Sequence, residues 1–219
     1  MNDEQYRKLA IGALYSEQQT AYINSLITGL DKNHINTILS QWWGIDNSSM
    51  AKNKLDYLAN KGFNYYFDTV LKCFEISNEL QKNTIIQSSF SNNEDIEKAY
   101  DQLDNLQDIY DDLIKNNIIS SMSDLRSYGN IGWDCGRLVF LSRLCFDAGY
   151  LSEQEAWNYI NKAYNMAIEK FNNWNEFSKS YIIGRGMWGG TDCGNEGIMM
   201  IAEKLLFNKK SPWVKLSFK

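Results

Sequence analysis

Apolar residues recur every three or four positions along most of the chain, which is the spacing that places them on one face of an α-helix. The clearest example is the segment 92–114, whose heptad seam consists of Ile96, Ala99, Leu103, Leu106, Tyr110 and Leu113. A seam of this kind predicts a long helix that lies along other helices of a bundle. No useful length of the sequence alternates apolar and polar residues as a half-buried β-strand would. The pattern therefore predicts an all-α, single-domain bundle of about eight or nine helices.

Capping residues divide this pattern into separate elements. An S-x-x-E capping box at residues 91–94 and a second one at 152–155 each mark the start of a helix, because the paired side chains satisfy its first backbone amides. Residues 120–132 are expected to form a loop or a short helical turn. Helices are expected over 4–29 with a break near residue 16, 34–43, 49–61, 63–80, 92–114, 133–148, 152–170, 174–184 and 196–207.

The polar segment 83–92 is the first internal boundary that the sequence suggests. It divides the chain into an N-terminal helical part, 1–90, and a C-terminal helical part, 91–219. The two parts are expected to pack as one compact domain. The single proline, Pro212, supports a chain of uninterrupted helices, because proline is excluded from helix interiors.

The face opposite the heptad seam carries a row of four aspartates, Asp101, Asp104, Asp108 and Asp111. Carboxylates along one straight helix face diverge and do not encircle a metal ion, so no metal site is expected there. The simplest interpretation is a solvated face, and the alternative is a docking surface for a basic protein. The formal net charge of −5 permits such a partner and disfavours binding to nucleic acid.

Several further signals concern the location of the protein. The first residues do not form a secretory signal, and no run of 18 apolar residues occurs, so a cytoplasmic protein without a membrane span is expected. The four cysteines, Cys73, Cys135, Cys145 and Cys193, form no C-x-x-C pair. We therefore expect buried, reduced thiols and no zinc site.

The candidate chemistry lies mostly between residues 129 and 190. Asp134 and Arg137 are three positions apart on a helix that is apolar nearly all round, so both are expected to be buried and to need charged partners. Arg185 is a candidate partner for Asp134. Glu155 is a candidate partner for Arg137 or Arg143.

Two interpretations of these charges remain open. In the first, they form a satisfied network that fixes helix packing. In the second, Arg137, Arg185 and the glycine-rich segment 184–190 form an anion-binding pocket, since glycines let a ligand approach the backbone and arginine binds carboxylate or phosphate with two donors. The candidate ligand-binding residues are Asp134, Arg137, Glu155, Arg185 and Trp188. The tryptophans at 133, 157, 174 and 188 are expected in the core rather than around a sugar or a base.

Catalytic residues are not evident in the sequence. His34 is the only histidine, and no Ser-His-Asp, Cys-His or H-E-x-x-H arrangement exists around it. Asp134 and Glu155 remain as an acid/base pair, although the sequence does not fix their separation. The expectation is a protein without catalytic residues or cofactors that is more readily a binding protein than an enzyme.

Several motifs in order resemble one bacterial family, domain-of-unknown-function family 1266 (DUF1266). They are W-G-I at 43–45, W-D-x-x-R at 133–137, A-G-Y-L-S-x-x-E-A-W at 148–157, W-x-x-F at 174–177, Y-x-x-G-R-x-x-W at 181–188 and S-P-W at 211–213. The resemblance covers roughly residues 40–219 and is weakest at the acidic helix. It implies a helical bacterial domain and transfers no catalytic residue. Some relatives lie near polymorphic-toxin genes, which favours a role in interbacterial competition.

Two hypotheses for the function follow. The first is a non-enzymatic protein-binding domain, an immunity-type protein that neutralises a basic toxin domain through the acidic face. The second is a small-ligand-binding protein or enzyme with a pocket around Asp134, Arg137, Arg185 and Trp188.

Overall fold

The structure is a computed structural model that describes the backbone of residues 1–219 and every side chain except those of residues 192 and 193. Helices and short helical turns account for all the regular structure in this described chain, and the prediction of an all-α fold is confirmed. None of the described helices is long and apolar enough to cross a membrane. The elements are α1 (Asp3–Ala10), α2 (Ala13–Gln18), α3 (Lys32–Asn36), the π-helix η1 (Thr37–Trp42), α4 (Ser48–Asn60), the 3₁₀ turn η2 (Asn64–Tyr66), α5 (Phe67–Phe74), α6 (Glu79–Ser89), α7 (Asn93–Lys115), α8 (Met122–Tyr128), α9 (Ile131–Asp147), α10 (Glu153–Lys170), α11 (Trp174–Gly189), the 3₁₀ turn η3 (Gly190–Cys193), α12 (Asn195–Phe207) and α13 (Pro212–Lys215).

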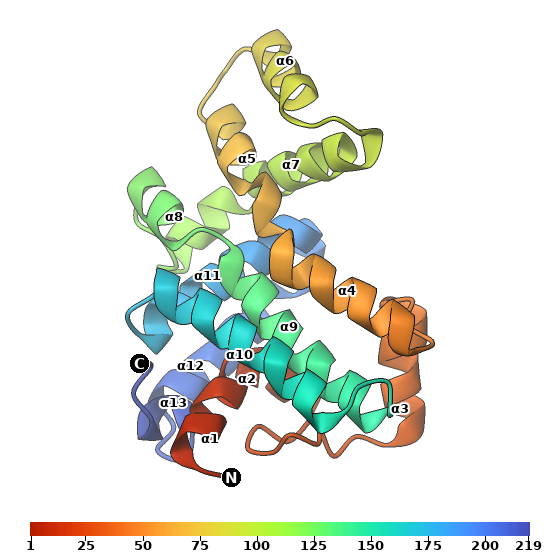
Figure 1. Ribbon diagram of the computed structural model, residues 1–219. Helices are drawn as coiled ribbons and strands as arrows, with labels where there is room; N and C mark the ends of the chain where they lie inside the picture. Colours follow the sequence, from red (N-terminus) through yellow and green to blue (C-terminus); the bar gives the residue numbers. More distant parts are fainter.

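Helix α9 lies at the centre of the molecule (Figure 1). It packs against α10, α11, α4 and α2, and every side chain from residue 132 to residue 145 is buried. A helix that is apolar nearly all round has no face suited to water, so other helices cover it on all sides. Helices α9 and α10 are joined by the short connection 148–152 and form a helical hairpin.

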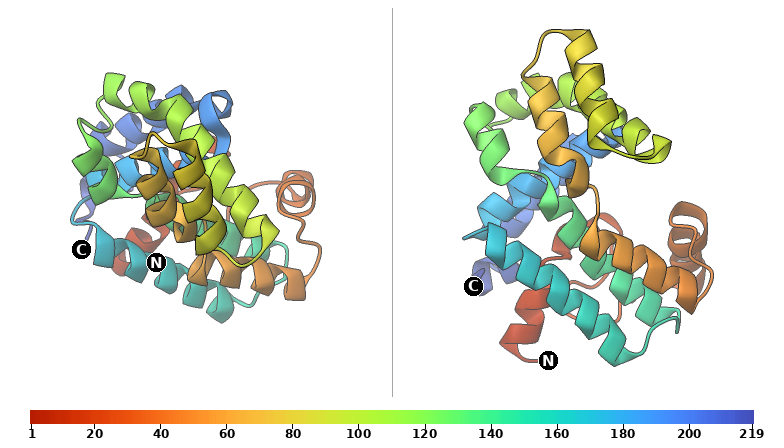
Figure 2. Two further views of the ribbon diagram at one scale, coloured as in Figure 1. Left: turned by 90° about the horizontal axis from the view of Figure 1, so that it is seen from above. Right: turned by 45° about the horizontal axis from the view of Figure 1, so that its top comes forward.

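Helices α5 and α6 and the first part of α7 lie at the end of the molecule away from both chain termini (Figures 1 and 2). Helix α7 then continues along α11. Its buried seam includes Ala99, Leu103, Leu106 and Leu113, as the heptad pattern predicts. Helix α7 therefore connects the outlying α5–α6 unit to the main body.

The expected helix 4–29 is wrong in its second half. The chain breaks at Gly12, where a Cβ atom would lie 2.7 Å from a methyl carbon of Val139 on α9, and residues after α2 form a loop. The guanidinium of the fully buried Arg143 holds that loop, because it donates hydrogen bonds to the carbonyl oxygens of Tyr22, Leu26 and Ile27. These bonds span more than a hundred residues, so local spacing does not reveal them.

A second difference concerns the expected helix 63–80 and the polar boundary 83–92. The first helix ends at Phe74, and α6 occupies most of the boundary. Asn78 starts α6 by accepting a hydrogen bond from the amide of Gln81, and Ile86 anchors the helix in the core. A single buried apolar side chain and a good cap are enough to form a helix from a stretch that is otherwise polar.

The two expected capping boxes have different outcomes. At residues 152–155 the box is present, with the backbone amide of Ser152 donating to Glu155 at 2.8 Å. At 91–94 the helix begins one residue later than expected. Asn92 is the N-cap there and accepts from the amide of Asp95 at 2.9 Å.

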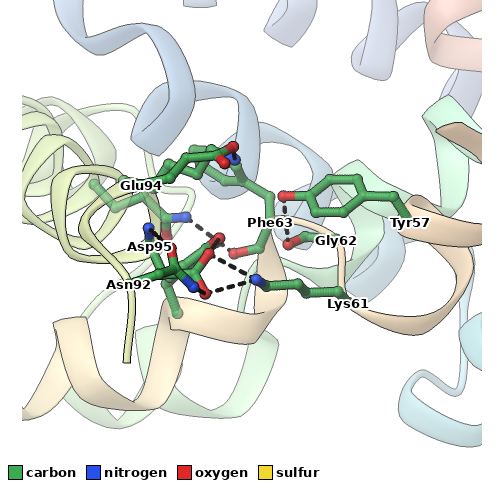
Figure 3. Close-up of polar contacts among 10 residues, drawn as sticks. Tyr57, Lys61, Gly62, Phe63, Asn92, Glu94 and Asp95 are labelled. Carbon is green, nitrogen blue, oxygen red and sulfur yellow. Dashed lines mark hydrogen bonds and ion pairs between the residues drawn. The ribbon is translucent and has the colours of Figure 1, made fainter. Parts of the chain in front are cut away.

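The turn between α4 and α5 is fastened to α7 by an ion pair (Figure 3). Lys61 Nζ lies 2.6 and 2.7 Å from the two carboxylate oxygens of Asp95, which also accepts from the Tyr66 hydroxyl at 2.6 Å and from the Asn92 side-chain amide at 2.8 Å. Burial pushes the pKa of Asp95 upward, but these hydrogen bonds and the charge of Lys61 outweigh burial and lower the pKa to about 2. Asp95 therefore stabilises the fold in its ionised form.

We expect Asp95→Asn to lower the free energy of unfolding at neutral pH by about 2 kcal/mol, the usual loss for hydrogen bonds to a charged group. Because the folded pKa lies below the ordinary value, this stabilisation is fully present above about pH 4 and is lost as the pH falls through about 2. Thermal unfolding of both proteins between pH 7 and pH 3 tests this, with the exposed Asp101→Asn as a control on the same helix. A difference in Tm that does not shrink towards low pH contradicts the assignment.

Candidate functional site

A cavity of about 530 Å³ lies between α2, η1, α9 and α11. We call it the Trp/Arg cavity after the side chains that dominate its wall. It falls within the usual size range of sites for small ligands. Its lining consists of Tyr15, Gln18, Gln19, Trp42, Trp43, Trp133, Arg137, Arg185 and Trp188.

The Arg137 guanidinium lies among aromatic rings in the wall of the cavity. Its Cζ atom is 4.7 Å from the ring centroid of Trp133, 5.6 Å from that of Trp43 and 5.8 Å from that of Phe63. The same guanidinium donates a hydrogen bond to the carboxylate of Asp134. Cation–π contacts and an ion pair therefore hold this charge in a fixed orientation at the cavity wall.

Asp134 lies behind this wall and does not line the cavity. It is only 1% exposed, and its oxygens accept hydrogen bonds from the backbone amides of Phe63, at 2.8 and 2.9 Å, and Asn64, at 2.8 Å. Gly62 has a φ of +60°, and a Cβ atom there would lie 2.5 Å from an Asp134 oxygen. Burial raises the pKa of Asp134, while Arg137 and the two amides act in the opposite direction. The carboxylate is occupied in holding the turn after α4.

Helix α11 contributes the second charged side chain of the cavity, Arg185. Arg185 is half-buried, and its Cζ lies 5.7 Å from the ring centroid of Trp133. Trp188, one turn further on, has its ring centroid 6.0 Å from that of Trp133. Asn105 of α7 fixes this end of α11 by donating to the carbonyl oxygens of Met187, at 3.0 Å, and Trp188, at 3.2 Å.

One of the two interpretations left open by the sequence had the glycine-rich segment expose its backbone to a ligand, and the positions of Gly184 and Gly186 do not support that part of it. Gly184 and Gly186 lie inside α11. A Cβ atom on Gly184 would lie 2.4 Å from Cβ of Trp133, and one on Gly186 would lie 2.5 Å from a methyl carbon of Ile109. The glycines instead let α11 pass close to α9 and α7, which brings Arg185 to the cavity.

The wall that sequence reasoning missed is the π-helix η1. Trp42 and Trp43 end it, and Gly44 follows with a φ of +63°. Trp43 Nε1 lies 3.4 Å from the Tyr15 hydroxyl of α2. Short π-helical segments are frequent at functional sites, but a six-residue segment has no distinct hydrophobic period by which to recognise it.

Glu155 is not part of the cavity, and its expected pairing with Arg137 or Arg143 is wrong. It forms a surface ion pair with Lys52 at 2.6 Å and caps α10 through Ser152. Hydrogen bonds from Lys52 and Ser152 lower the pKa of Glu155 to about 2. Glu155 therefore has a separate, local role at the start of α10.

The tryptophans divide into two groups. Trp133 and Trp174 are buried, as expected, and Trp157 is partly buried. Trp188 is 52% exposed, so placing it in the core was wrong. Its exposure follows from its position on the last turn of α11, where the helix reaches the cavity and ends.

The four aspartates Asp101, Asp104, Asp108 and Asp111 are all exposed, as a solvated face requires. Partial burial, the neighbouring charges of Asp101 and Asp108, and Glu79 of α6 raise the pKa of Asp104. The close spacing of these carboxylates concentrates negative charge on this face of α7, and their repulsion contributes to the raised pKa of Asp104.

The described side chains offer no metal centre. No group of three or more histidine, cysteine, aspartate or glutamate side chains among them is arranged to hold an ion. Cys73, Cys135 and Cys145 are buried, free thiols, as expected, and burial raises the pKa of each. The expectation for Cys193 falls on a side chain outside the described part.

The chemistry of the Trp/Arg cavity suits binding. Among the side chains that the structure describes, its lining contributes two guanidiniums, five aromatic side chains and two amides, and includes no carboxylate, imidazole or thiol. Groups of the last three kinds are the usual proton donors, acceptors and nucleophiles of enzymes. A cationic ligand would meet two positively charged side chains in this wall.

Comparison with known proteins gives one result. A family model described as a protein of unknown function (DUF1266) matches residues 38–218. Searches among curated proteins and solved structures gave no match. The matched range contains both arginines and all four tryptophans of the cavity, while Tyr15, Gln18 and Gln19 precede it.

We expect Asp134→Asn to lower the free energy of unfolding by about 3–5 kcal/mol, the cost of removing one partner of a buried ion pair. The new amide group would place N–H donors against the amides of Phe63 and Asn64 and leave Arg137 without its carboxylate. Urea unfolding of both proteins measures this, with the exposed Asp111→Asn as the matched control. A loss no larger than that of the control would show that the carboxylate does not hold the turn.

Proposed function

The chain belongs to the DUF1266 family of proteins of unknown function, and we propose that it binds a small organic anion in its Trp/Arg cavity. The observation that carries this proposal is the presence of two guanidiniums, those of Arg137 and Arg185, beside aromatic rings in the described part of the lining. Guanidiniums bind carboxylate and phosphate oxygens through two parallel donors. Aromatic walls reduce the contact of the ion pair with water and so strengthen it.

The two arginines have different parts in this function. Arg137 is fixed by Asp134 and by the rings of Trp133 and Trp43 before any ligand arrives, so its orientation costs no entropy on binding. Arg185 lies across the cavity on α11 and is half-buried. Arg185 is less deeply buried than Arg137, and it is therefore the better position for a test.

We expect Arg185→Gln to weaken the binding of small anions at least tenfold, because the glutamine side chain keeps the length of the arginine stem but not its charge. Thermal shift with acetate, succinate, benzoate, phosphate and methyl phosphate identifies the anions that raise Tm, and calorimetry then gives their Kd. Arg126→Gln is the matched control, since Arg126 pairs with Glu75 on the surface and does not line the cavity. An unchanged Kd in Arg185→Gln, or a panel in which no anion raises Tm, contradicts the proposal.

A second proposed function is the docking of a basic protein on the acidic row of α7, as an immunity-type protein would dock a bacterial toxin domain. The exposure of all four aspartates on one face of α7 supports it. Rows of like charge speed association with a partner of opposite charge. The free, buried thiols agree with a reducing cytoplasm as the location of such a protein.

For this second function we expect the double variant Asp104→Lys/Asp108→Lys to keep its Tm and to lose a basic partner captured from a lysate of the source organism. The control is Glu153→Lys/Glu169→Lys, which changes the net charge equally at exposed positions of α10. The captured partner should also dissociate as salt is raised. Equal capture by both double variants would exclude the acidic row as the docking surface.

A further inference from the structure

Two tryptophans at the mouth of the Trp/Arg cavity expose their rings to solvent. Trp42, at the end of η1, is 57% exposed, and Trp188, at the end of α11, is 52% exposed. None of the other five tryptophans of the chain reaches that exposure, and both of these two line the same cavity. Exposed aromatic surface gathered at one cavity indicates a contact surface for a ligand.

Other aromatic side chains line the same cavity. The rings of Trp133 and Trp188 lie 6.0 Å apart at a tilt of 41°, and that of Tyr15 lies 6.3 Å from that of Trp133 on another side. The two guanidiniums lie over the Trp133 ring. A flat ring entering this space would meet ring faces and edges, while a charged substituent would meet the arginines.

Most of the described lining of the cavity is aromatic or charged, and its uncharged polar groups are few. Of its uncharged polar groups, the Tyr15 hydroxyl lies 3.4 Å from Trp43 Nε1, and Gln19 Oε1 lies 3.2 Å from Nε2 of His34. Gln18 Oε1 is buried and has no partner among the described residues. The Trp133 Nε1 donor also has no partner among the described residues, so only a few uncharged polar atoms remain for a polar substituent of the ligand.

We propose that the anion bound by this cavity is an aromatic carboxylate, a flat ring system with a single negative group. The ring packs against Trp42 and Trp188, and the carboxylate faces Arg137 and Arg185. This inference rests on the proposed anion binding and adds the shape and the class of the ligand. A volume of about 530 Å³ accommodates one or two fused rings.

Three probes of similar size separate the ring from the charge. Naphthalene-2-carboxylate has both features, decahydronaphthalene-2-carboxylate has the charge without the aromatic ring, and naphthalene-2-methanol has the ring without the charge. Calorimetric titration of the full chain gives the Kd of each. We expect naphthalene-2-carboxylate to bind at least tenfold more tightly than either of the others.

Each outcome affects a different claim. Equal binding of the saturated carboxylate overturns the aromatic class and leaves anion binding intact. Equal binding of the naphthyl alcohol overturns anion binding as the function and, with it, the carboxylate in this proposal. Weak binding of all three probes overturns the aromatic carboxylate, and the anion panel then decides separately whether the cavity binds anions at all.

Variants at the mouth test the location of the site. Trp188→Leu and Trp42→Leu should each weaken naphthalene-2-carboxylate about fivefold to tenfold and keep Tm, since exposed rings contribute little to the core. Phe207→Leu is the control, because Phe207 is 76% exposed and lies outside the cavity. Loss of affinity in the control, or none in the two tryptophan variants, places the aromatic probe elsewhere and contradicts the proposal.

Discussion

The Asp134 carboxylate ties together parts of the chain that no local pattern connects. It accepts the backbone amides of Phe63 and Asn64, which begin the turn into α5, and it pairs with Arg137 one helical turn away on α9. An unpaired charge at such a buried position would cost several kcal/mol, about 3–5 when one partner of a pair is lost. The position of α4 and α5 and the orientation of the cavity arginine therefore depend on the same group. A change at Asp134 has to affect both.

The helix α7 extends this connection to the other side of the cavity. At its start Asp95 holds Lys61, the residue that precedes the turn fixed by Asp134. Ten residues later Asn105 holds the end of α11 next to Trp188. The outward face of the same helix carries the acidic row. A protein bound to that row would contact α7, the helix whose Asn105 holds the end of α11 at the cavity. The two proposed functions therefore share α7 as a structural element.

The sequence predicted the type of the elements and the burial of the key charges, but not their partners. The heptad seam of α7, the capping box of α10 and the buried pair of Asp134 and Arg137 all follow from spacings of three or four residues. The loop after α2 does not, because it depends on Arg143, more than a hundred residues away. The end of α5 at Phe74 does not either, since the apolar spacing continues beyond it while the chain turns into the separate helix α6.

The cavity itself was predicted only in part, for a related reason. Arg137, Arg185 and Trp188 lie in motifs of the second half of the chain, and the structure brings them together. Tyr15, Gln18 and the π-helix tryptophans come from the first fifth of the chain, and nothing in their local pattern points to residues 133–188. The assignment of Glu155 to the site failed because a capping box is a complete local structure that engages the carboxylate.

The exposed rings of Trp42 and Trp188 are the part of the structure that stability alone does not explain. The other tryptophans are buried or partly buried, and Trp174 stacks on Trp213 with ring centroids 5.1 Å apart. Leaving a large ring half in water forgoes part of the free energy that burial supplies, about 25 cal/mol for each Å² of apolar surface. Sequences selected for folding tend to be consistent at every level, and departures from that consistency concentrate at functional sites. Two such departures at one cavity that also holds two guanidiniums are therefore better explained by a ligand than by the packing of the domain.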